Sequence, residues 1–284
     1  MKVGLVLEGG ACKGIFTAGV LDHWMKNDVY FPYVVSVSAG TCNALDYLSN
    51  QPERTKNCMI PNNKKDRYYG FSRFIRSGHM LDLKRVFEEY PVKQFPFDTE
   101  AYMQSDIVNE MVVTNCLNGE AGYLSEKEDA HKLFEIAKAS CSLPLLSEMV
   151  TIDGVPYLDG GMADSVPIQR AFMNGCDKVV VVLTHNDGYV PQISDRLKRI
   201  YVRKYTKYPH LLETILNRPK MYAGEMELLD QYVKEGKVFV VKPGAEGVRR
   251  LERNMDRMNE FYQLGYQRAE ESFDQLQQFM LPIN

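Results

Sequence analysis

The sequence has few cysteines and no long hydrophobic run. No apolar stretch in its 284 residues approaches the roughly 18–20 residues that a membrane-spanning helix requires. The six cysteines form no C-x-x-C pair, which argues against a zinc site or a small disulfide scaffold and fits reduced thiols. A strand pattern begins almost at the first residue, so we expect no signal peptide and a cytoplasmic protein.

Neither sign of charge is in excess. Lysine and arginine number 34 and aspartate and glutamate 37, which leaves a formal net charge of −3. We therefore expect no nucleic-acid partner, and contact with an anionic membrane would need a local basic patch. The composition, 45% hydrophobic and 25% charged, is that of an ordinary globular protein with an ample core.

Strand and helix patterns alternate along the chain. Residues 2–7 are aliphatic, as in a strand buried on both faces, and a glycine-rich turn and a helical pattern follow. The unit repeats with a strand at 33–37 and a helix at 40–49. This alternation predicts an α/β protein whose mostly parallel sheet is covered by helices on both faces.

The rest of the chain continues the pattern, with one irregular stretch. Two hairpins are predicted, at residues 110–124 with an Asn-Gly turn and at residues 147–161 with an Asp-Gly turn. Buried strands are predicted at residues 177–185 and 236–244. A helix capped by Ser125 is predicted at residues 125–140, and a long amphipathic tail helix at residues 247–280. Residues 50–98 are polar, aromatic and irregular. Within them, the aromatic segment 67–80 is either a lid over a site or a buried scaffold. No repeat or linker is evident, so we expect one globular unit.

The glycine-rich turn LEGGACKG follows the first strand. It is not a dinucleotide fingerprint, because Ala11 takes the place of the second conserved glycine, and it is not a phosphate loop, because Ile15 follows Gly14. Backbone N–H groups of such a turn at a helix amino terminus can hold an oxyanion. The alternative is a tight connection between strand and helix with no further role.

The segment VVSVSAGTCNALD predicts a strand, a sharp turn and a helix, with Ser38 at the turn. This order is typical of a nucleophile elbow, G-x-S-x-G, in which residues two positions from the serine must be small. Here Ser36 replaces the first glycine and Gly40 keeps the second. The helix that follows would direct its positive end toward Ser38. A plain small-residue turn is the alternative.

A serine nucleophile needs a base, and two candidates stand out. One is His185, at the end of a strand; Ser38, Asp159 and His185 follow the chain order of an ordinary α/β-hydrolase. In that fold, however, several strands precede the nucleophile, whereas Ser38 follows only the second. The other candidate is Asp159, which ends a strand and is followed by two glycines. To act as the base it would need a desolvated site and a short bond to the serine.

Together these elements resemble the patatin-like phospholipase family. The family pattern is an acidic-Gly-Gly-Gly-x-Arg/Lys-Gly loop after the first strand, G-x-S-x-G after the second, and Asp-Gly-Gly/Ala later. The matching residues are Glu8-Gly9-Gly10-Ala11-Cys12-Lys13-Gly14, Ser36-Val37-Ser38-Ala39-Gly40 and Asp159-Gly160-Gly161. The segment IAKASCSLPLL resembles the helix-to-loop segment that precedes the family's aspartate. The resemblance covers roughly residues 3–175, and residues 176–284 would continue the same globule.

The resemblance implies a three-layer α/β/α fold and a Ser-Asp dyad that hydrolyses lipid acyl esters through an acyl-enzyme. Ser38 would be the nucleophile and Asp159 the general base. The amides of Gly9, Gly10, Ala11 and Cys12 would form the oxyanion hole, and Lys13 matches the basic position. No metal or organic cofactor is implied.

A lipid hydrolase must meet an aggregate surface, so a lipid ester at a membrane or micelle is the expected partner. Residues 196–208 interleave six basic residues with three tyrosines, which suits an anionic lipid interface, peripheral on the inner membrane surface. A solvated helix face is the alternative. Two other functions stay open: a His-dependent esterase that uses His185, and a non-catalytic lipid- or nucleotide-binding module that uses the glycine loop.

Overall fold

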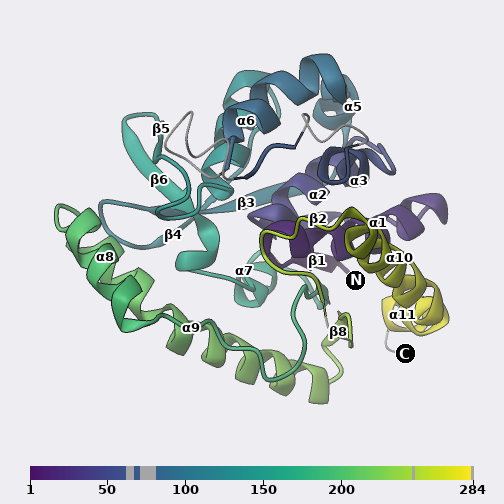
Figure 1. Cartoon of the computed structure of the whole chain (residues 1–284). Coiled ribbons are helices and arrows are strands. Elements are labelled where there is room, and N and C mark those ends of the chain that lie inside the picture. The colour runs from purple at the N-terminus through teal and green to yellow at the C-terminus, as the bar shows by residue number, and fades with distance from the viewer. Residues whose placement is uncertain (62–66, 71–80, 245–246, 283–284) are drawn as a thin grey trace.

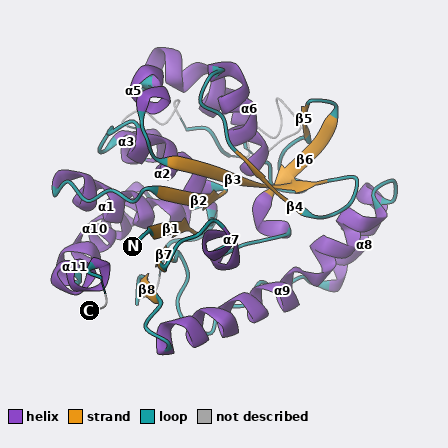
Figure 2. Cartoon of the chain, turned by 180° about the vertical axis from the view of Figure 1, so that it is seen from behind, coloured by secondary structure: helices purple, strands orange, loops and turns teal. Residues whose placement is uncertain are grey.

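The chain folds around a central sheet with helices on both faces (Figure 1). The computed structural model describes residues 1–61, 67–70, 81–244 and 247–282. Figure 2 shows the sheet between a layer that contains α2 and α6 and a layer that contains α7 and α9. The predicted α/β fold with a mostly parallel sheet is therefore confirmed.

The sheet contains eight strands within the described residues, and five neighbouring ones are parallel. These run in the order β3-β2-β1-β7-β8, and β6 and β5 extend the β3 edge in antiparallel orientation, while β4 also pairs with β3. The strands are β1 (Val3–Leu7), β2 (Tyr33–Val37), β3 (Val108–Asn115), β4 (Ala121–Leu124), β5 (Val150–Ile152), β6 (Val155–Asp159), β7 (Lys178–Val182) and β8 (Val238–Val241).

The helices divide between the two faces because alternate strand residues point to opposite sides. Leu5 and Leu7 share a core with α1, α2, α6 and α10, whereas Val6 packs with α7 and α9 on the other face. The helices are α1 (Gly14–Lys26), α2 (Ala39–Leu48), α3 (Arg54–Met59), α5 (Thr99–Gln104), α6 (Ala130–Ser140), α7 (Ile168–Met173), α8 (Asp195–Tyr205), α9 (Pro209–Lys234), α10 (Met255–Glu271) and α11 (Phe273–Met280). Shorter turns are η1 (Ala11–Lys13), η3 (Arg85–Gln94) and η4 (Gly160–Met162).

The strand order brings three loops to one edge of the sheet. The chain leaves β1 for β2 on one side and later returns to place β7 on the other side of β1. In open parallel sheets, ligands bind beyond the carboxyl ends of the strands at such a reversal. The glycine-rich turn after β1, Ser38 after β2 and His185 after β7 all lie at this edge.

Three sequence-based predictions are wrong in detail. The cap of α6 is Asp129, which accepts the N–H groups of His131 and Lys132, and not Ser125. The tail is two helices, α10 and α11, that are separated at Ser272. Residues 247–254 belong to no helix, since α10 begins only after Asn254, which caps its first turn. Residues 50–98 are not wholly irregular, since they contain α3 and the π-helical η3. Most of the segment considered as a lid, residues 71–80, lies outside the described residues.

No helix of the described chain is long and apolar enough to cross a bilayer.

Helices α1 and α10 touch at two glycines, which fixes the carboxyl-terminal region onto the core. A Cβ atom on Gly19 would lie 2.1 Å from the carbonyl oxygen of Tyr262, and one on Gly265 would lie 2.0 Å from that of Phe16. Both neighbours are backbone atoms that cannot yield cheaply. The Tyr262 hydroxyl also donates to the buried Asp22 carboxylate at 2.7 Å.

Gly265→Ala should destabilise the protein by about 1–3 kcal/mol, because the added methyl forces α10 away from α1. Gly224→Ala is the matched control, since Gly224 lies within α9 and its Cβ would meet nothing within 4 Å. That variant should gain about 0.5–1 kcal/mol from helix propensity. Urea unfolding midpoints measure both, and equal effects of the two substitutions would contradict the close packing.

Candidate active site

The sheet register places Ser38 and Asp159 at the same level. Val37 of β2 pairs with Val112 of β3, and the next β3 residue, Val113, pairs with Asp159 of β6. Ser38 follows Val37 directly. The serine and the aspartate are therefore held by the ends of two strands that flank β3, although they are far apart in the sequence.

Ser38 adopts the strained backbone of a nucleophile elbow. Its φ of 53° and ψ of −121° are rare for a residue with a side chain, and they turn the chain sharply from β2 into α2. The turn is possible because neighbours are small. A Cβ on Gly40 would lie 2.6 Å from the carbonyl oxygen of Leu7, and one on Gly9 would lie 2.9 Å from the Cβ of Ser38.

A chain of buried hydroxyl groups supports the elbow from behind. The amide of Ser38 donates to the Oγ of Ser140 at 3.0 Å, and Ser140 shares a hydrogen bond of 2.9 Å with Thr41. Ser36 donates to the Thr41 hydroxyl at 3.3 Å. The serine in place of the elbow's first glycine thus joins this network. Beside it, the Cys141 thiol donates to the carbonyl of Ser38 at 3.1 Å.

The Asp159 carboxylate is buried and only half satisfied. Its Oδ1 accepts the amide of Gly161 at 2.9 Å, whereas Oδ2 has no partner of good hydrogen-bond geometry among the described residues. Burial raises the pKa of Asp159, and the nearby Ser38 hydroxyl, the Gly161 amide and the charges of Arg218 and Arg250 offset part of that rise. Asp159 and Ser38 line the same small pocket.

The residue after the aspartate must be glycine for steric reasons. A Cβ on Gly160 would lie only 2.2 Å from the carbonyl oxygen of Val112. The second glycine, Gly161, is less constrained, since its Cβ would come no closer than 3.2 Å to Asp159. Its amide, bonded to Asp159, is the part of the residue that the site uses.

The loop after β1 presents unused amides. Those of Gly9, Gly10 and Ala11, which are half-buried, donate to no atom of the described residues. The Cys12 amide differs, since it donates to the carbonyl of Arg250 at 3.1 Å. Gly10 has φ 144°, and Ala11 keeps a left-handed φ of 50° although it is not glycine. The first three amides are the ones that could hold an oxyanion.

Lys13 and Gly14 support this loop. Gly14 lets α1 approach α2, because its Cβ would lie 2.7 Å from that of Ala39. The Lys13 ammonium lies over the ring of Tyr189, 5.5 Å from its centroid. Burial lowers the pKa of Lys13, which the charge of Glu8 partly offsets.

Glu8 bonds to the segment that follows β7, including His185. Its carboxylate accepts the amide of Thr184 at 2.6 Å, pairs with Nδ1 of His185 at 2.8 Å and accepts the hydroxyl of Tyr222 at 2.9 Å. Burial alone would raise the pKa of Glu8, but these partners outweigh it and hold the pKa below its usual value. Among the described residues, His185 makes no hydrogen bond to Ser38, and its ring stacks on Tyr189 at 3.7 Å.

The other histidines do not line the site. His23 packs edge-on against Tyr266 and Phe273, His131 is exposed and faces Glu135, and His210 is exposed at the start of α9. His79 lies outside the described residues. Nor does the described part of the chain gather three or more histidine, cysteine, aspartate or glutamate side chains suited to a metal ion.

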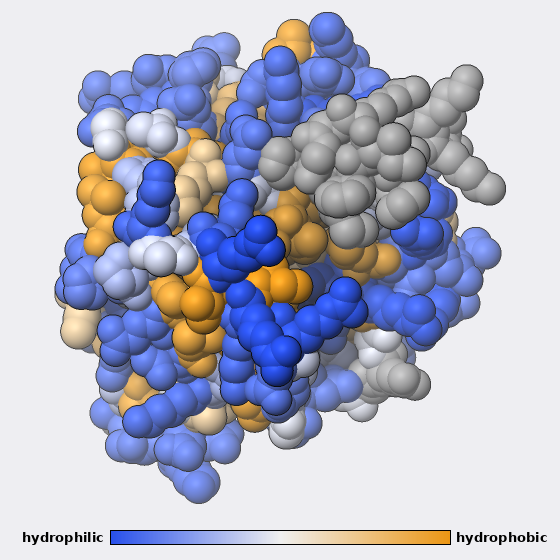
Figure 3. Space-filling view, turned by 60° about the vertical axis from the view of Figure 1, so that its left-hand side comes forward, coloured by the Kyte–Doolittle hydropathy of each residue, from blue (hydrophilic) through white to orange (hydrophobic). Residues whose placement is uncertain are grey.

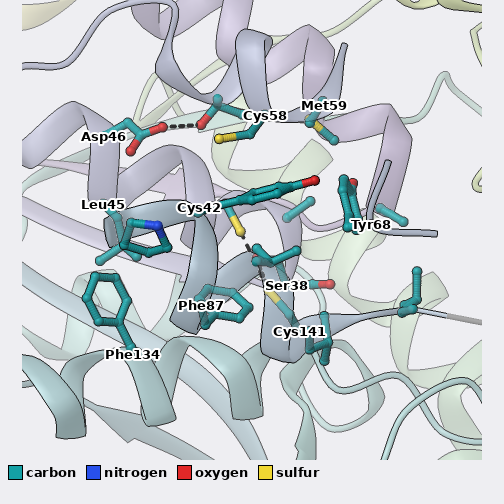
Figure 4. Close-up of a pocket in the computed structure, with 18 of the residues that line it drawn as sticks. Ser38, Cys42, Leu45, Asp46, Cys58, Met59, Tyr68, Phe87, Phe134 and Cys141 are labelled. Atoms are coloured by element: carbon teal, nitrogen blue, oxygen red, sulfur yellow. Dashed lines mark hydrogen bonds between the residues drawn. The ribbon is translucent and has the colours of Figure 1, made fainter. Parts of the chain in front are cut away.

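Two pockets meet at Ser38. A polar pocket of about 350 Å³ is lined by Ser38, Asp159, His185 and the glycine loop. A mostly apolar pocket of about 820 Å³ shares Ser38, Ala11 and Leu143 with it. Figure 4 shows Ser38 on one side of this apolar pocket and Phe134 and Asp46 on the other. The serine thus stands between a polar space and an apolar one.

Comparison with known proteins agrees with these motifs. A family model described as patatin-like phospholipase matches residues 5–172. The chain belongs to this family. A second family model, a domain of unknown function (DUF6363), matches residues 208–281.

One relative in sequence and one solved structure extend the comparison beyond the patatin-like domain. The uncharacterized protein YjjU of Escherichia coli K12 is 30% identical over 207 residues, which are 70% of this chain. The match spans 57% of YjjU, so it covers little more than half of that relative. The crystal structure of VipD from Legionella pneumophila superposes with a TM-score of 0.51 at 11% identity, covering 96% of this chain and 67% of VipD. This second likeness supports the fold alone.

Sequence patterns missed three side chains that shape the patatin-like site. Ser140 lies in the segment IAKASCSLPLL, which resembles the family, but nothing in the sequence assigns its hydroxyl to the elbow. Arg218 and Arg250 line the polar pocket from the carboxyl-terminal region. Their neighbours in the sequence carry no motif, so only the fold reveals them.

Ser140→Ala should lower the free energy of unfolding by at least about 1 kcal/mol more than Ser142→Ala does. The first substitution leaves the buried Ser38 amide without its acceptor, a loss of about 1–3 kcal/mol. Ser142 is a matched control, since it is also buried but its hydroxyl donates only to the Lys138 carbonyl. Urea unfolding compares them, and equal losses would argue against support of the elbow by Ser140.

Proposed function

We propose that the chain is a lipid acyl hydrolase that acts through a Ser38–Asp159 dyad. The observation that carries the proposal is the unpartnered Oδ2 of a buried aspartate beside a serine in the elbow conformation. A desolvated carboxylate with a raised pKa is a stronger base than an exposed one, which suits it to take the serine proton. Membership of the patatin-like phospholipase family supports the same chemistry.

The proposed reaction is ester hydrolysis in two steps. Ser38 Oγ attacks the ester carbonyl while Asp159 takes its proton, and the amides of Gly9, Gly10 and Ala11 stabilise the negative oxygen. The tetrahedral intermediate collapses to an acyl-serine, and the alcohol leaves with the proton from Asp159. Water, deprotonated by Asp159, then attacks the acyl-serine, and the fatty acid is released as the serine regains its proton.

The apolar pocket suits an acyl chain. Apolar and aromatic side chains predominate in its wall, as in most sites that hold a small molecule. Arg54 and Asp46 also line it, but they neutralise each other in an ion pair of 2.6 Å. An acyl chain there would place its carbonyl at Ser38.

A lipid surface is the proposed partner, met by α8. The six basic side chains of residues 196–208 are exposed, and two apolar ones on α8, Ile200 and Val202, are 43% and 48% exposed. A helix with cationic and exposed apolar side chains can lie in the interface of an anionic bilayer. This supports a peripheral, cytoplasmic-side location for the proposed enzyme.

Asp159→Asn should lower kcat for p-nitrophenyl butyrate by about 10²–10⁴-fold, because the amide cannot accept the serine proton. Ser38→Ala should remove the acyl-enzyme route altogether. His185→Gln tests the His-dependent alternative, since His185 lines the same pocket. The dyad predicts that it keeps activity within about tenfold of the parent. A fully active Asp159→Asn protein together with an inactive His185→Gln protein would establish the alternative.

The pH dependence of kcat/KM measures the pKa of the catalytic base in the free enzyme. Asp159 must be ionised to act, so activity should fall as pH falls through its pKa, which lies above the 3.8 of an ordinary aspartate. Arg250→Gln should move this acid limb to higher pH, because the positive charge of Arg250 lowers the pKa of Asp159. Arg249→Gln is the control at an exposed neighbour. An acid limb at pH 3.8 or below in the parent would contradict a desolvated base.

A further inference from the structure

Two arginines reach the polar pocket from a region with no assigned role. Arg218 lies in α9 and Arg250 in the loop before α10, and both line the pocket that contains Ser38 and Asp159. Both fall within residues 208–281, the part of the chain that matches a domain of unknown function. The catalytic motifs all lie outside that region.

Neither guanidinium group forms an ion pair within the described residues, although the charges of Asp159 and Glu8 act on Arg218 from nearby. Arg218 donates through Nε to the carbonyl of Gly161 at 2.6 Å, which leaves its other nitrogens without a hydrogen bond to described atoms. The side chain of Arg250 makes no hydrogen bond or ion pair there. The nearby Glu8 is already committed to Thr184, His185 and Tyr222.

The two arginines also repel each other. Burial lowers the pKa of Arg218, and the charge of Arg250 lowers it further. The charge of Arg250 also lowers the pKa of Lys13, so a third cation lies near Arg250. The carboxylates of Asp159 and Glu8 offset part of this repulsion. A bound anion with more than one negative charge would relieve the remainder.

The positions of the cavities indicate which part of a bound substrate would lie next to the arginines. A third cavity of about 730 Å³ is lined by Arg218 and Arg250 and by Leu145 and Tyr201. Leu143 lines all three cavities, so the apolar pocket, the polar pocket and the third cavity adjoin one another. With the acyl chain in the apolar pocket, the alcohol side of the ester points toward the arginines.

Figure 3 looks onto the side of the molecule that carries β5, β6 and α8. Hydrophobic residues gather there around a hollow, and strongly hydrophilic residues lie beside it. The third cavity is lined partly by α8, through Leu197 and Tyr201. A substrate whose alcohol part carries a charge would therefore meet both an apolar wall and the arginines.

We propose that Arg218 and Arg250 bind a phosphate group on the alcohol side of the scissile ester, which selects acyl esters of a phosphorylated alcohol. Phosphate suits the site because its oxygens accept paired N–H donors from two guanidinium groups and its charge at neutral pH approaches −2. A carboxylate would neutralise only one of the cations. The proposal rests on the proposed ester hydrolysis, and it gives residues 208–281 the role of recognising the substrate.

The test compares two esters that differ only in the phosphate: 1-oleoylglycerol 3-phosphate and 1-oleoylglycerol, each kept monomeric. The ratio of their kcat/KM values should favour the phosphate ester in the parent enzyme. Arg250→Gln should lower that ratio about ten- to hundredfold through KM of the phosphate ester, and Arg250→Lys should restore part of it. Arg249→Gln, a loss of the same charge at an exposed neighbour, should leave the ratio within about twofold.

The outcomes separate the two proposals. If the parent hydrolyses neither ester, the proposed function fails and the phosphate site fails with it. If it hydrolyses both and Arg250→Gln leaves the ratio unchanged, ester hydrolysis stands and the phosphate site is overturned. A last experiment measures how inorganic phosphate inhibits the hydrolysis of 1-oleoylglycerol. If Arg250→Gln weakens this inhibition but leaves the ratio of the two kcat/KM values unchanged, the arginines bind a free anion and the proposal is wrong. A thermal melt of each variant confirms folding.

Discussion

The backbone of Ser38 is held in a conformation that a side chain normally forbids, and the rest of the site depends on it. Strain of this kind persists only where the surroundings fix it. Here Gly40 lets α2 pass close to β1, Gly9 makes room beside the serine, and Ser140 accepts the serine's amide. The register of β2, β3 and β6 then brings Asp159 to the level of the serine. Small residues and strand pairing together therefore align two groups that lie far apart in the sequence.

The carboxyl-terminal region holds both halves of this arrangement. The carbonyl of Arg250 accepts the amide of Cys12 in the loop after β1, and Nε of Arg218 donates to the carbonyl of Gly161 in the loop after β6. The contact between α1 and α10 through Gly19 and Gly265 anchors the region to the core. Residues 208–281 are thus bonded to the proposed oxyanion loop and to the loop of the proposed base, although the family match ends at residue 172.

The sequence could predict what depends on local pattern. The parallel strands, both hairpins and the turn at Ser38 followed from alternation, glycine turns and small residues, and the family motifs gave the candidate residues. It could not predict the hydroxyl chain through Ser140 or the two arginines, because these depend on contacts between distant segments. The tail was predicted as one helix because its apolar spacing is helical throughout. In the structure the carbonyl of Arg250, before α10, accepts the amide of Cys12, and no local pattern in the sequence indicates such a bond between distant segments.

The central claim is that Ser38 is the nucleophile of an acyl-transfer site. The most direct measurement is peptide mapping by mass spectrometry after reaction with a fluorophosphonate, which forms a stable adduct with an activated serine. The account predicts a single adduct on Ser38, absent from Ser38→Ala and formed far more slowly by Asp159→Asn. An adduct on another residue, or none in a protein that still hydrolyses esters, would contradict it.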